Sequence, residues 1–512
     1  MCRIALSLAL AVPLFLQTGA SFAQDGSKSL ADAGLAIPPP PREMEARKSW
    51  LQDRLNDALA TPALAKAKVA VAVMDSETGK LIYTRNEKAL MNVASNVKLV
   101  TEAATLSALG PEFRFKTAVL APIPPEGGKP IGTGGELRGD LFLRAMGDPS
   151  LDTEDLVSLA NQLAAGGLRK VRGGLVIDSS AFDNTILPPA FEQKNESAAF
   201  RAPSSAASLE SNVITLTLIP GATAGAKGRV IVDPPSPAIL VTGSIVTSKE
   251  PSSLQVETGD GGEGRTIVTV SGRIQAGVEP RILTRRVWDP ETFLGATFRQ
   301  VLQKRGISVD KPTRSGAIPK DGMRTLAAHD SPTLAVIVHE LGKRSSNFAA
   351  EQLLRTLGGE TFGRPGTFPK GIDAVGKYLD GLGIAKTAYT MKNGSGLYDS
   401  NRFTAEQLAT VIRAAMRDFR MGSEYLASLA VGGADGTLAH RMAGSPAERF
   451  VRAKTGTLAT VSCLSGVAGA PGMKPLVFSI LINEVASPTA ARAVQDRITA
   501  TLVVFLDPSL AK

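Results

Sequence analysis

The 512-residue chain contains the stretch ASNVKLVTEAATLSALGP at positions 94–111. This stretch predicts a helix that begins at Ser95 and stops after Leu109, because a glycine past the helix end followed by a proline is a typical stop signal. Lys98 comes three residues after Ser95, so it lies on the same face, one turn deeper. A serine hydroxyl is a weak nucleophile until a base takes its proton. A lysine can be that base when burial, a neighbouring positive charge and the positive end of the helix dipole lower its pKa.

The Ser-x-x-Lys pattern is weak evidence when it stands alone. A second copy, Ser308-Val-Asp-Lys311, is followed directly by Pro312 and begins no predicted helix, so we attribute it to chance. On this phrase alone, an ordinary helix cap followed by a surface lysine is the better explanation of Ser95 and Lys98.

Two further phrases change this balance. Ser345-Ser-Asn347 lies between two predicted helices, and Lys454-Thr-Gly456-Thr457 lies at the end of a predicted strand. On a strand beside a cleft, the ammonium group of Lys454 and the neighbouring hydroxyls can hold a substrate carboxylate, and Gly456 lets a substrate backbone come close. Each phrase alone is typical of a cap or a turn. Their order and their placement on these elements together indicate a catalytic site.

In this order the three phrases resemble the motifs of the penicillin-binding proteins and serine β-lactamases. The 247 positions between Lys98 and Ser345 leave room for a large insertion. Such an insertion resembles the type-4 low-molecular-mass (class C) penicillin-binding proteins, the D-alanyl-D-alanine carboxypeptidase/endopeptidases. The resemblance covers about residues 45–507. It is supported by further phrases, which are Gly147-Asp-Pro-Ser-Leu151, Ile177-Asp-Ser-Ser-Ala-Phe182, Ala202-Pro203 with Ser208-Leu209, Asn393-Gly-Ser-Gly-Leu397, Asp435-Gly-Thr-Leu438 and Val461-Ser462.

The resemblance implies a serine-type DD-peptidase that hydrolyses D-Ala-D-Ala bonds (EC 3.4.16.4) and D-alanyl cross-links of peptidoglycan. Ser95 would attack the carbonyl carbon, and Lys98 would take its proton. Ser345 would relay a proton to the leaving amine, and Asn347 would hold Lys98 and the substrate amide. Water would then hydrolyse the acyl-enzyme, and β-lactams would trap Ser95 as a slow acyl-enzyme. The implied partners are therefore peptidoglycan stem peptides and cross-links, with β-lactam antibiotics as inhibitors.

The same resemblance assigns the substrate-binding residues. Lys454 and Thr455 would bind the terminal carboxylate beside Gly456, and the backbone N–H groups of Ser95 and Thr457 would form the oxyanion hole. Asp178 is a candidate for meeting an amino group of the substrate, and an ordinary turn aspartate is an equally good explanation.

Two positions depart from the family pattern. Ser346 stands where the related motif often has Asp, a position at which family members vary. Asp399 follows Tyr398 where many relatives have a Ser-Arg pair, which puts the side-chain specificity for the stem peptide in doubt.

Other kinds of chemistry have little support in the sequence. The three histidines lack the partners that a Ser-His-Asp triad or a zinc site would need, and we find no phosphate-binding glycine loop. Neither a cofactor nor a metal is therefore expected. The net charge is +9, but the lysines and arginines are scattered and form no basic run interleaved with aromatic residues. Nucleic acid is therefore not an expected partner.

The beginning of the chain predicts export. Arg3 and an apolar stretch at about 4–16 precede Ser21-Phe22-Ala23, so residues 1–23 are predicted to be a signal peptide and residues 24–42 a Pro-rich leader. No other segment is long and apolar enough to predict a transmembrane anchor. The mature chain would keep one cysteine, Cys463, and would be periplasmic.

The remaining pattern predicts an α/β (α+β) fold, which the resemblance describes as a transpeptidase-like antiparallel sheet flanked by helices, with a large β-rich insertion. Residues 43–110 and 286–512 are predicted to form a discontinuous DD-peptidase domain, in which strands at 68–74 and 81–84 pair with strands near 450–453, 461–468 and 476–482. Residues 111–285 show short β-like runs between Gly and Pro turns, and are predicted to be an inserted β-rich region of two subdomains.

Two other functions compete with the DD-peptidase. A β-lactamase shares the nucleophile, but the chain has no Glu-x-x-Leu-Asn phrase to carry a deacylating base, and the 247-position gap is too long. A silent wall-binding protein would not need the intact set of Ser95, Lys98, Ser345, Asn347 and Lys454. Penicillin labelling separates the silent protein from the peptidase, and antibiotic turnover separates the β-lactamase.

Overall fold

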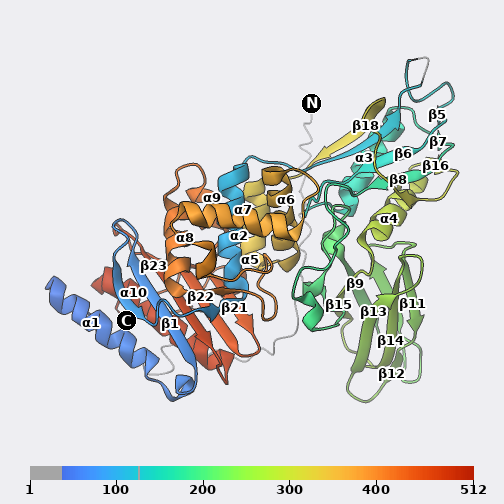
Figure 1. Ribbon diagram of the computed structural model, residues 1–512. Coiled ribbons are helices and arrows are strands. Elements are labelled where there is room, and N and C mark those ends of the chain that lie inside the picture. Colours follow the sequence, from blue (N-terminus) through green and yellow to red (C-terminus); the bar gives the residue numbers. More distant parts are fainter. Residues whose placement is uncertain (1–36, 125–126, 512) are drawn as a thin grey trace, which may run out of the picture.

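The computed structural model describes residues 37–124 and 127–511. Figure 1 shows two bodies side by side. One combines strands from both ends of the chain with a layer of helices. The other is elongated and is built from the middle of the chain, coloured cyan through green to yellow.

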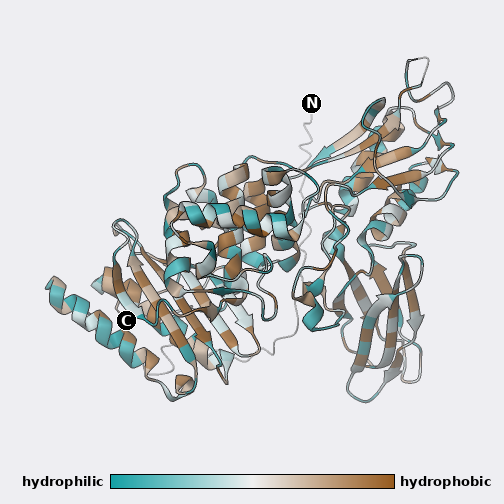
Figure 2. Cartoon of the chain, in the orientation of Figure 1, coloured by the Kyte–Doolittle hydropathy of each residue, from teal (hydrophilic) through white to brown (hydrophobic). Residues whose placement is uncertain are grey.

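The first body is organised around a six-stranded antiparallel sheet in the order β2-β1-β23-β22-β21-β20. Val-rich and Ile-rich runs form its central strands, and all eight residues of β22 are buried, because helices cover both faces of the sheet. The strands of this sheet are largely hydrophobic in Figure 2. Their bounds are β1 Lys68–Asp75, β2 Leu81–Arg85, β20 Ala430–Val431, β21 Val451–Leu458, β22 Val461–Ala468 and β23 Leu476–Asn483. The predicted pairing of N-terminal with C-terminal strands is therefore present.

Two helices, α1 (Met44–Leu59) and α10 (Pro488–Leu506), pack on one face of the sheet (Figure 1). The other face carries the helical layer that surrounds α2 (Val97–Leu109), in which residues 97–106 are all buried. A helix that is buried all round is enclosed by neighbours. These neighbours are α5 (Leu334–Arg344), α6 (Asn347–Phe362), α7 (Phe368–Gly381), α8 (Ala405–Arg417) and α9 (Gly422–Ser428). Strand β3 (Met91–Asn92), just ahead of α2 in the chain, forms a small sheet with β19 (Arg402–Phe403).

The inserted region is entered and left through one pair of antiparallel strands. Its first strand β4 (Lys116–Pro122) pairs with its last strand β18 (Met323–Asp330), with Lys116 opposite Asp330. The sheet that they begin has the order β17-β8-β6-β4-β18, and a smaller sheet has the order β16-β7-β5. The bounds are β5 Glu136–Leu137, β6 Leu141–Arg144, β7 Lys170–Val171, β8 Leu175–Asp178, β16 Ser308–Val309 and β17 Arg314–Ser315.

This topology differs from the predicted boundary at residue 285. Helix α4 (Pro290–Lys304) and strands β16–β18 belong to the inserted region, which ends near Asp330 rather than at 285. The apolar stripe of α4 is buried in the same core as the strands of the insertion. The short β-like runs between Gly and Pro turns, which end near residue 285, therefore do not mark the end of the insertion.

The insertion also contains a helix that the β-rich pattern concealed. Helix α3 (Thr153–Ala165) begins with a reciprocal capping box between Asp152 and Asp155. It buries Leu156, Leu159 and Leu163, at helical spacing, in the core of the insertion.

A second group of sheets forms the far part of the insertion. One sheet has the order β10-β9-β15, and the other has β11-β14-β12 with β13 also paired to β14. Both groups of sheets contribute to one continuous hydrophobic core. The bounds are β9 Val213–Ile219, β10 Arg229–Asp233, β11 Ile239–Gly243, β12 Val246–Ser248, β13 Ser253–Asp260, β14 Thr266–Gln275 and β15 Arg281–Arg286.

The predicted signal peptide and most of the predicted leader lie outside the described residues. Across positions 37–124 and 127–511, every helix is too short or too polar to cross a membrane.

Candidate active site

Ser95 and Lys98 meet at the start of the buried helix α2. Ser95 lies in a single 3-10 turn, Ala94–Asn96, that leads into the helix, and it is partly exposed. Lys98 is fully buried, and its Nζ lies 3.0 Å from Ser95 Oγ. Nζ also donates to Asn347 Oδ1 at 2.8 Å and to the carbonyl oxygen of Ser395 at 2.6 Å. The amine is therefore fixed against the hydroxyl by two further acceptors.

The surroundings of Lys98 disfavour its charged form. Burial lowers the pKa of Lys98 well below its usual value, and the positive charge of Lys454 acts in the same direction. The carboxylates of Glu351 and Glu102 act in the opposite direction, with smaller effects. A lysine with a lowered pKa is neutral for part of the time near neutral pH, as a general base must be.

A second serine and lysine face each other across the site. Lys454 lies in the middle of β21 rather than at a strand end, and its Nζ donates to Ser345 Oγ at 2.7 Å. Ser345 ends α5 in the left-handed conformation, with φ of 57°. Burial lowers the pKa of Lys454 to about 8, and Glu102 opposes this shift.

The structure explains why the middle residue of Ser345-Ser-Asn347 can vary. Ser346 is the N-cap of α6, and its Oγ accepts a hydrogen bond from Ala349 N at 3.1 Å. Asp is an equally good N-cap. Asn347, the first residue of α6, points its oxygen at Lys98 and donates through Nδ2 to the carbonyl oxygen of Phe200 at 2.9 Å. The inserted region thus helps to orient a residue of the site.

The strand that carries Lys454 also presents groups suited to a bound carboxylate. Thr455 is partly exposed, and its Oγ1 donates to Thr437 Oγ1 at 2.9 Å. Val451 O accepts from Gly432 N on the β20 side of the strand. Because backbone groups alternate in direction along a strand, the N–H of Thr457 points to the same edge. Ala430 pairs with Ala453, and beyond Ala430, towards Thr457, the described part of the chain places no further strand along that edge.

Gly456 has a different close neighbour from the one expected. A Cβ at this position would lie 2.9 Å from Val93 O and 3.2 Å from Ala94 Cβ. The glycine therefore lets the turn that carries Ser95 pack directly on β21. The predicted approach of a substrate backbone to Gly456 stays a prediction.

The loop at 393–401 completes the site. In the sequence, this loop is recognisable only as one of the phrases shared with the family. The fully buried carboxylate of Glu351 accepts hydrogen bonds from Gly394 N at 3.1 Å and from Ser395 N at 2.8 Å. This fixes the Ser395 carbonyl group that binds Lys98. Sequence reasoning missed Glu351, although a carboxylate in the apolar stretch of α6 was a visible signal.

We expect Gly396→Ala to disrupt this loop. Gly396 has a φ of 81°, and a Cβ there would lie 1.9 Å from Ala94 O, beside the nucleophile. Displacement of the reacting groups by about 1 Å can cost about 10²-fold in rate, and we expect a loss of that order in acylation of Ser95. The matched control is Gly363→Ala, because Gly363 has a φ of 85° with nothing within 4 Å of its Cβ. It should lose only stability, measured by thermal unfolding. Equal loss of acylation in both variants would contradict the argument.

Asp178 and Asp399 are both engaged within the protein. The Asp178 oxygens accept hydrogen bonds from Ser180 N at 3.0 Å and Ile318 N at 3.1 Å, as a turn aspartate would. Its role towards a substrate amino group stays a prediction. Asp399 Oδ1 pairs with Arg402 at 2.5 Å and accepts from Asn92 Nδ2 at 3.1 Å.

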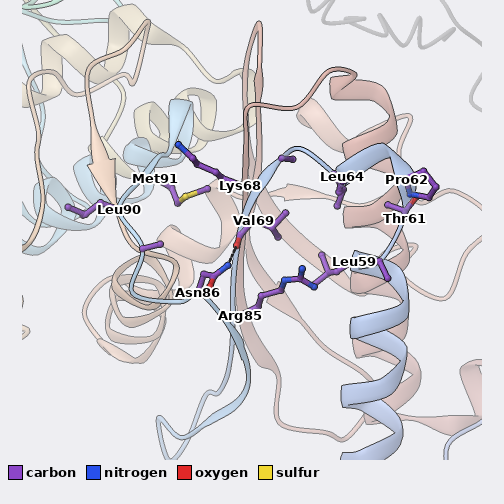
Figure 3. A pocket seen from close by; sticks show the side chains of 14 residues that line it. Leu59, Thr61, Pro62, Leu64, Lys68, Val69, Arg85, Asn86, Leu90 and Met91 are labelled. Atoms are coloured by element: carbon purple, nitrogen blue, oxygen red, sulfur yellow. Dashed lines mark hydrogen bonds between the residues drawn. The ribbon is translucent and has the colours of Figure 1, made fainter.

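A cavity of about 770 Å³ lies elsewhere in the molecule. It is formed by the connection from α1 to β1 and by residues 85–91, with Lys68 and Arg85 at its sides (Figure 3). None of the motif residues is among its lining residues. The catalytic constellation is thus defined by hydrogen bonds rather than by this cavity.

A serine and two lysines held between an antiparallel sheet and a buried helix define the class of penicillin-binding proteins and serine β-lactamases. Within this class, the chain belongs to the D-Ala-D-Ala carboxypeptidase 3 (S13) family, whose model matches residues 51–504. The family and the enzyme class predicted from the motifs are confirmed.

Named relatives agree with this assignment. The chain is 34% identical over 483 residues to the D-alanyl-D-alanine carboxypeptidase of Actinomadura sp. (strain R39), covering 90% of this chain and 86% of the relative. It is 27% identical over 392 residues to the D-alanyl-D-alanine carboxypeptidase DacB of Haemophilus influenzae, covering 76% and 79%. The crystal structure of penicillin binding protein 4 from H. influenzae matches with a TM-score of 0.75 at 24% identity, covering 88% of this chain and 98% of that one. This likeness confirms the predicted fold.

Proposed function

We propose that this protein is a DD-peptidase that hydrolyses D-Ala-D-Ala bonds and D-alanyl cross-links of peptidoglycan through an acyl-enzyme on Ser95. The observation that carries the proposal is the contact between the buried Lys98 amine and Ser95 Oγ, 3.0 Å apart. A hydroxyl with a partly neutral amine held against it is an activated nucleophile. The names of the relatives supply the substrate class.

Acylation would begin when neutral Lys98 takes the Ser95 proton and Ser95 Oγ attacks the carbonyl carbon of the penultimate D-Ala. The negative charge that develops on the carbonyl oxygen would be met by the N–H groups of Ser95 and Thr457. The N–H of Thr457 points to the β20 side of β21, at a part of that edge which no described strand covers, since β20 pairs only with residues 452 and 453. This fits the role that the family resemblance implies.

The leaving group needs a proton before the amide bond can break. Ser345 Oγ accepts a hydrogen bond from Lys454, so its own proton is free to pass to the leaving amine. Lys98 ends this step with the proton that Ser95 gave up, and a proton from the Ser345–Lys454 pair leaves with D-Ala. Lys98 would then return its proton to the Ser345–Lys454 pair and become neutral again. When water attacks the ester, Lys98 would take a proton from the water and give it to Ser95 Oγ as the ester bond breaks. Asn347 holds Lys98 in place throughout.

The terminal carboxylate of the substrate would bind at Lys454 and Thr455, with Thr437 supporting the threonine hydroxyl. A β-lactam carries a carboxylate and a reactive carbonyl group in a similar arrangement and would acylate the same serine. Each Asp178 oxygen accepts one described backbone hydrogen bond, and a carboxylate oxygen can accept a second one, so an amino group on the stem peptide could still bind there. We place the enzyme in the periplasm, acting in peptidoglycan maturation, on the strength of the predicted signal peptide.

Incubation of the purified protein with a fluorescent penicillin tests this function. We expect one covalent label per chain on a denaturing gel, competed by excess unlabelled penicillin, and release of D-Ala from a pentapeptide. Rapid loss of the label with antibiotic turnover would favour a β-lactamase. Well-folded protein that takes no label would contradict the proposal and favour a silent wall-binding protein.

A further inference from the structure

Helix α2 carries a buried carboxyl group that the mechanism above does not use. Glu102 follows Lys98 by four residues, so it lies one turn deeper on the same face. Its side chain is fully buried. Oε2 accepts a hydrogen bond from Ser428 Oγ at 2.8 Å. The other oxygen, Oε1, is buried without a hydrogen-bond partner among the residues that the structure describes.

The carboxyl group of Glu102 is enclosed by tightly packed elements. Ser428 ends α9, and a Cβ on Gly342 of α5 would lie 2.4 Å from Ser428 O. Lys343 of α5 is occupied elsewhere, with Leu429 O and Asp435 each 2.7 Å from its Nζ. The position therefore leaves Glu102 little room to move away from its neighbours.

The charged groups near Glu102 come from several elements. Lys98 on its own helix and Lys454 on β21 both interact with it electrostatically, and so does Tyr425 on α9. Of the other helices around α2, α6 contributes Glu351, α7 contributes Tyr378, whose phenol faces Tyr425, and α8 buries only apolar side chains.

Charge balance singles out Glu102 as the partner of Lys454. The described partners of Lys454 Nζ are both neutral, namely the Ser345 hydroxyl and the Thr455 carbonyl oxygen. Glu351 has each of its oxygens occupied by a backbone N–H. A buried ammonium group without a nearby negative charge is strongly destabilised. Glu102 has the free oxygen and the burial needed to compensate it.

We propose that Glu102 is the counter-ion of Lys454, a positioning residue that keeps this ammonium group protonated on the alkaline side of neutrality and so ready for the substrate's terminal carboxylate. This inference rests on the proposed function and adds a residue to it.

The direction of the titrations agrees with this role. Burial raises the pKa of Glu102 to about 7, and burial lowers that of Lys454 to about 8. Glu102 is therefore charged in the range where Lys454 would begin to lose its proton. Below about pH 6 Glu102 is neutral, and its negative charge no longer acts on either lysine.

The test is Glu102→Gln, with kcat and KM measured from pH 5.5 to 9.5 for a peptide that ends in D-Ala-D-Ala. At pH 6 we expect near-normal kinetics. At high pH, kcat/KM falls as Lys454 loses its proton, and we expect this alkaline limb of the pH profile to shift to lower pH by about one unit. At pH 9 this shift is about a tenfold loss in kcat/KM, carried mainly by KM because carboxylate binding is weakened. Thr105→Val is the matched control, since it removes a buried hydroxyl from the same helix, and it should leave the limb in place.

A second variant and a wild-type control show which results would contradict the inference. If Glu102→Gln does not fold, Ser428→Ala replaces it. Loss of that hydrogen bond raises the pKa of Glu102 and should shift the limb in the same direction by less. An unmoved alkaline limb in a folded variant would overturn the inference. A wild-type protein that neither takes penicillin nor releases D-Ala at any pH would instead overturn the proposed function.

Discussion

Ser95→Ala is expected to abolish covalent penicillin labelling and to lower D-Ala release by about 10⁴-fold or more, because it removes the proposed nucleophile. The fold should survive the change. Ser95 lies in a partly exposed turn, and its described side-chain hydrogen bond is to Lys98. Circular dichroism and thermal unfolding would verify this, and mass spectrometry of the intact protein would measure the missing adduct.

The chain provides its own control in the second Ser-x-x-Lys phrase. Ser308 lies in the short strand β16 of the inserted region, far along the chain from the helix that holds Lys98. Ser308→Ala should therefore label and hydrolyse normally. Label that survives in Ser95→Ala and disappears in Ser308→Ala would assign the nucleophile to the other phrase and contradict the mechanism.

The structure shows why spacing alone could not separate these two phrases. Ser308 and Lys311 have the same separation as Ser95 and Lys98, but no helix follows to bring the lysine onto the face of the serine. The predicted helix after Ser95, with its Gly-Pro stop, was the decisive local signal. Its neighbours in space, Asn347 and Ser395, come from hundreds of residues away, so only motif order could suggest them.

Regular elements with strong periodicity were predictable, and boundaries between domains were not. The predicted helix stop after Leu109 and the predicted strand at 461–468 match the end of α2 and the bounds of β22. The insertion instead ends with β18 at Asp330, because that strand pairs with β4 across a separation of some two hundred residues. No local pattern records such a pairing. Glu351 and Glu102 were missed for a related reason, since a glutamate within a helix is usually a surface residue.

The inserted region also contributes to the chemistry. Phe200 O fixes the amide of Asn347, whose oxygen in turn fixes Lys98. Tyr398 OH donates to Glu196 at 2.5 Å, which joins the loop at 393–401 to the segment of the insertion that carries Phe200. A change in the position of the insertion would therefore displace Lys98 through the hydrogen bond from Asn347 to Phe200 O and the hydrogen bond from Lys98 to Asn347.

Lys98→Met is the second change with a large expected effect. It removes the proton acceptor of Ser95, and loss of a general base costs about 10²–10⁴-fold. Methionine fills a similar volume but leaves Asn347 Oδ1 and the Ser395 carbonyl oxygen without the Lys98 donor. The variant should therefore fold but be less stable than the wild type, by about 1–3 kcal/mol. In the wild type, acylation should fall as the pH drops, because protonated Lys98 cannot take a proton and its pKa lies well below the usual lysine value. Stopped-flow acylation by a chromogenic β-lactam measures both effects.

The fall of the acylation rate at low pH distinguishes a general base from a residue that has only a structural role in the site. It should vanish in Lys98→Met, whose slow residual acylation would then be independent of pH in that range. Lys98→Arg keeps the positive charge but cannot lose its proton, so it should be as inactive as the methionine variant. If Lys98→Arg acylated at a near-normal rate, positive charge rather than basicity would be the requirement. Lys98 would then act by stabilising charge, and the proton of Ser95 would have to leave towards Ser345 and Lys454 on the other side of the site.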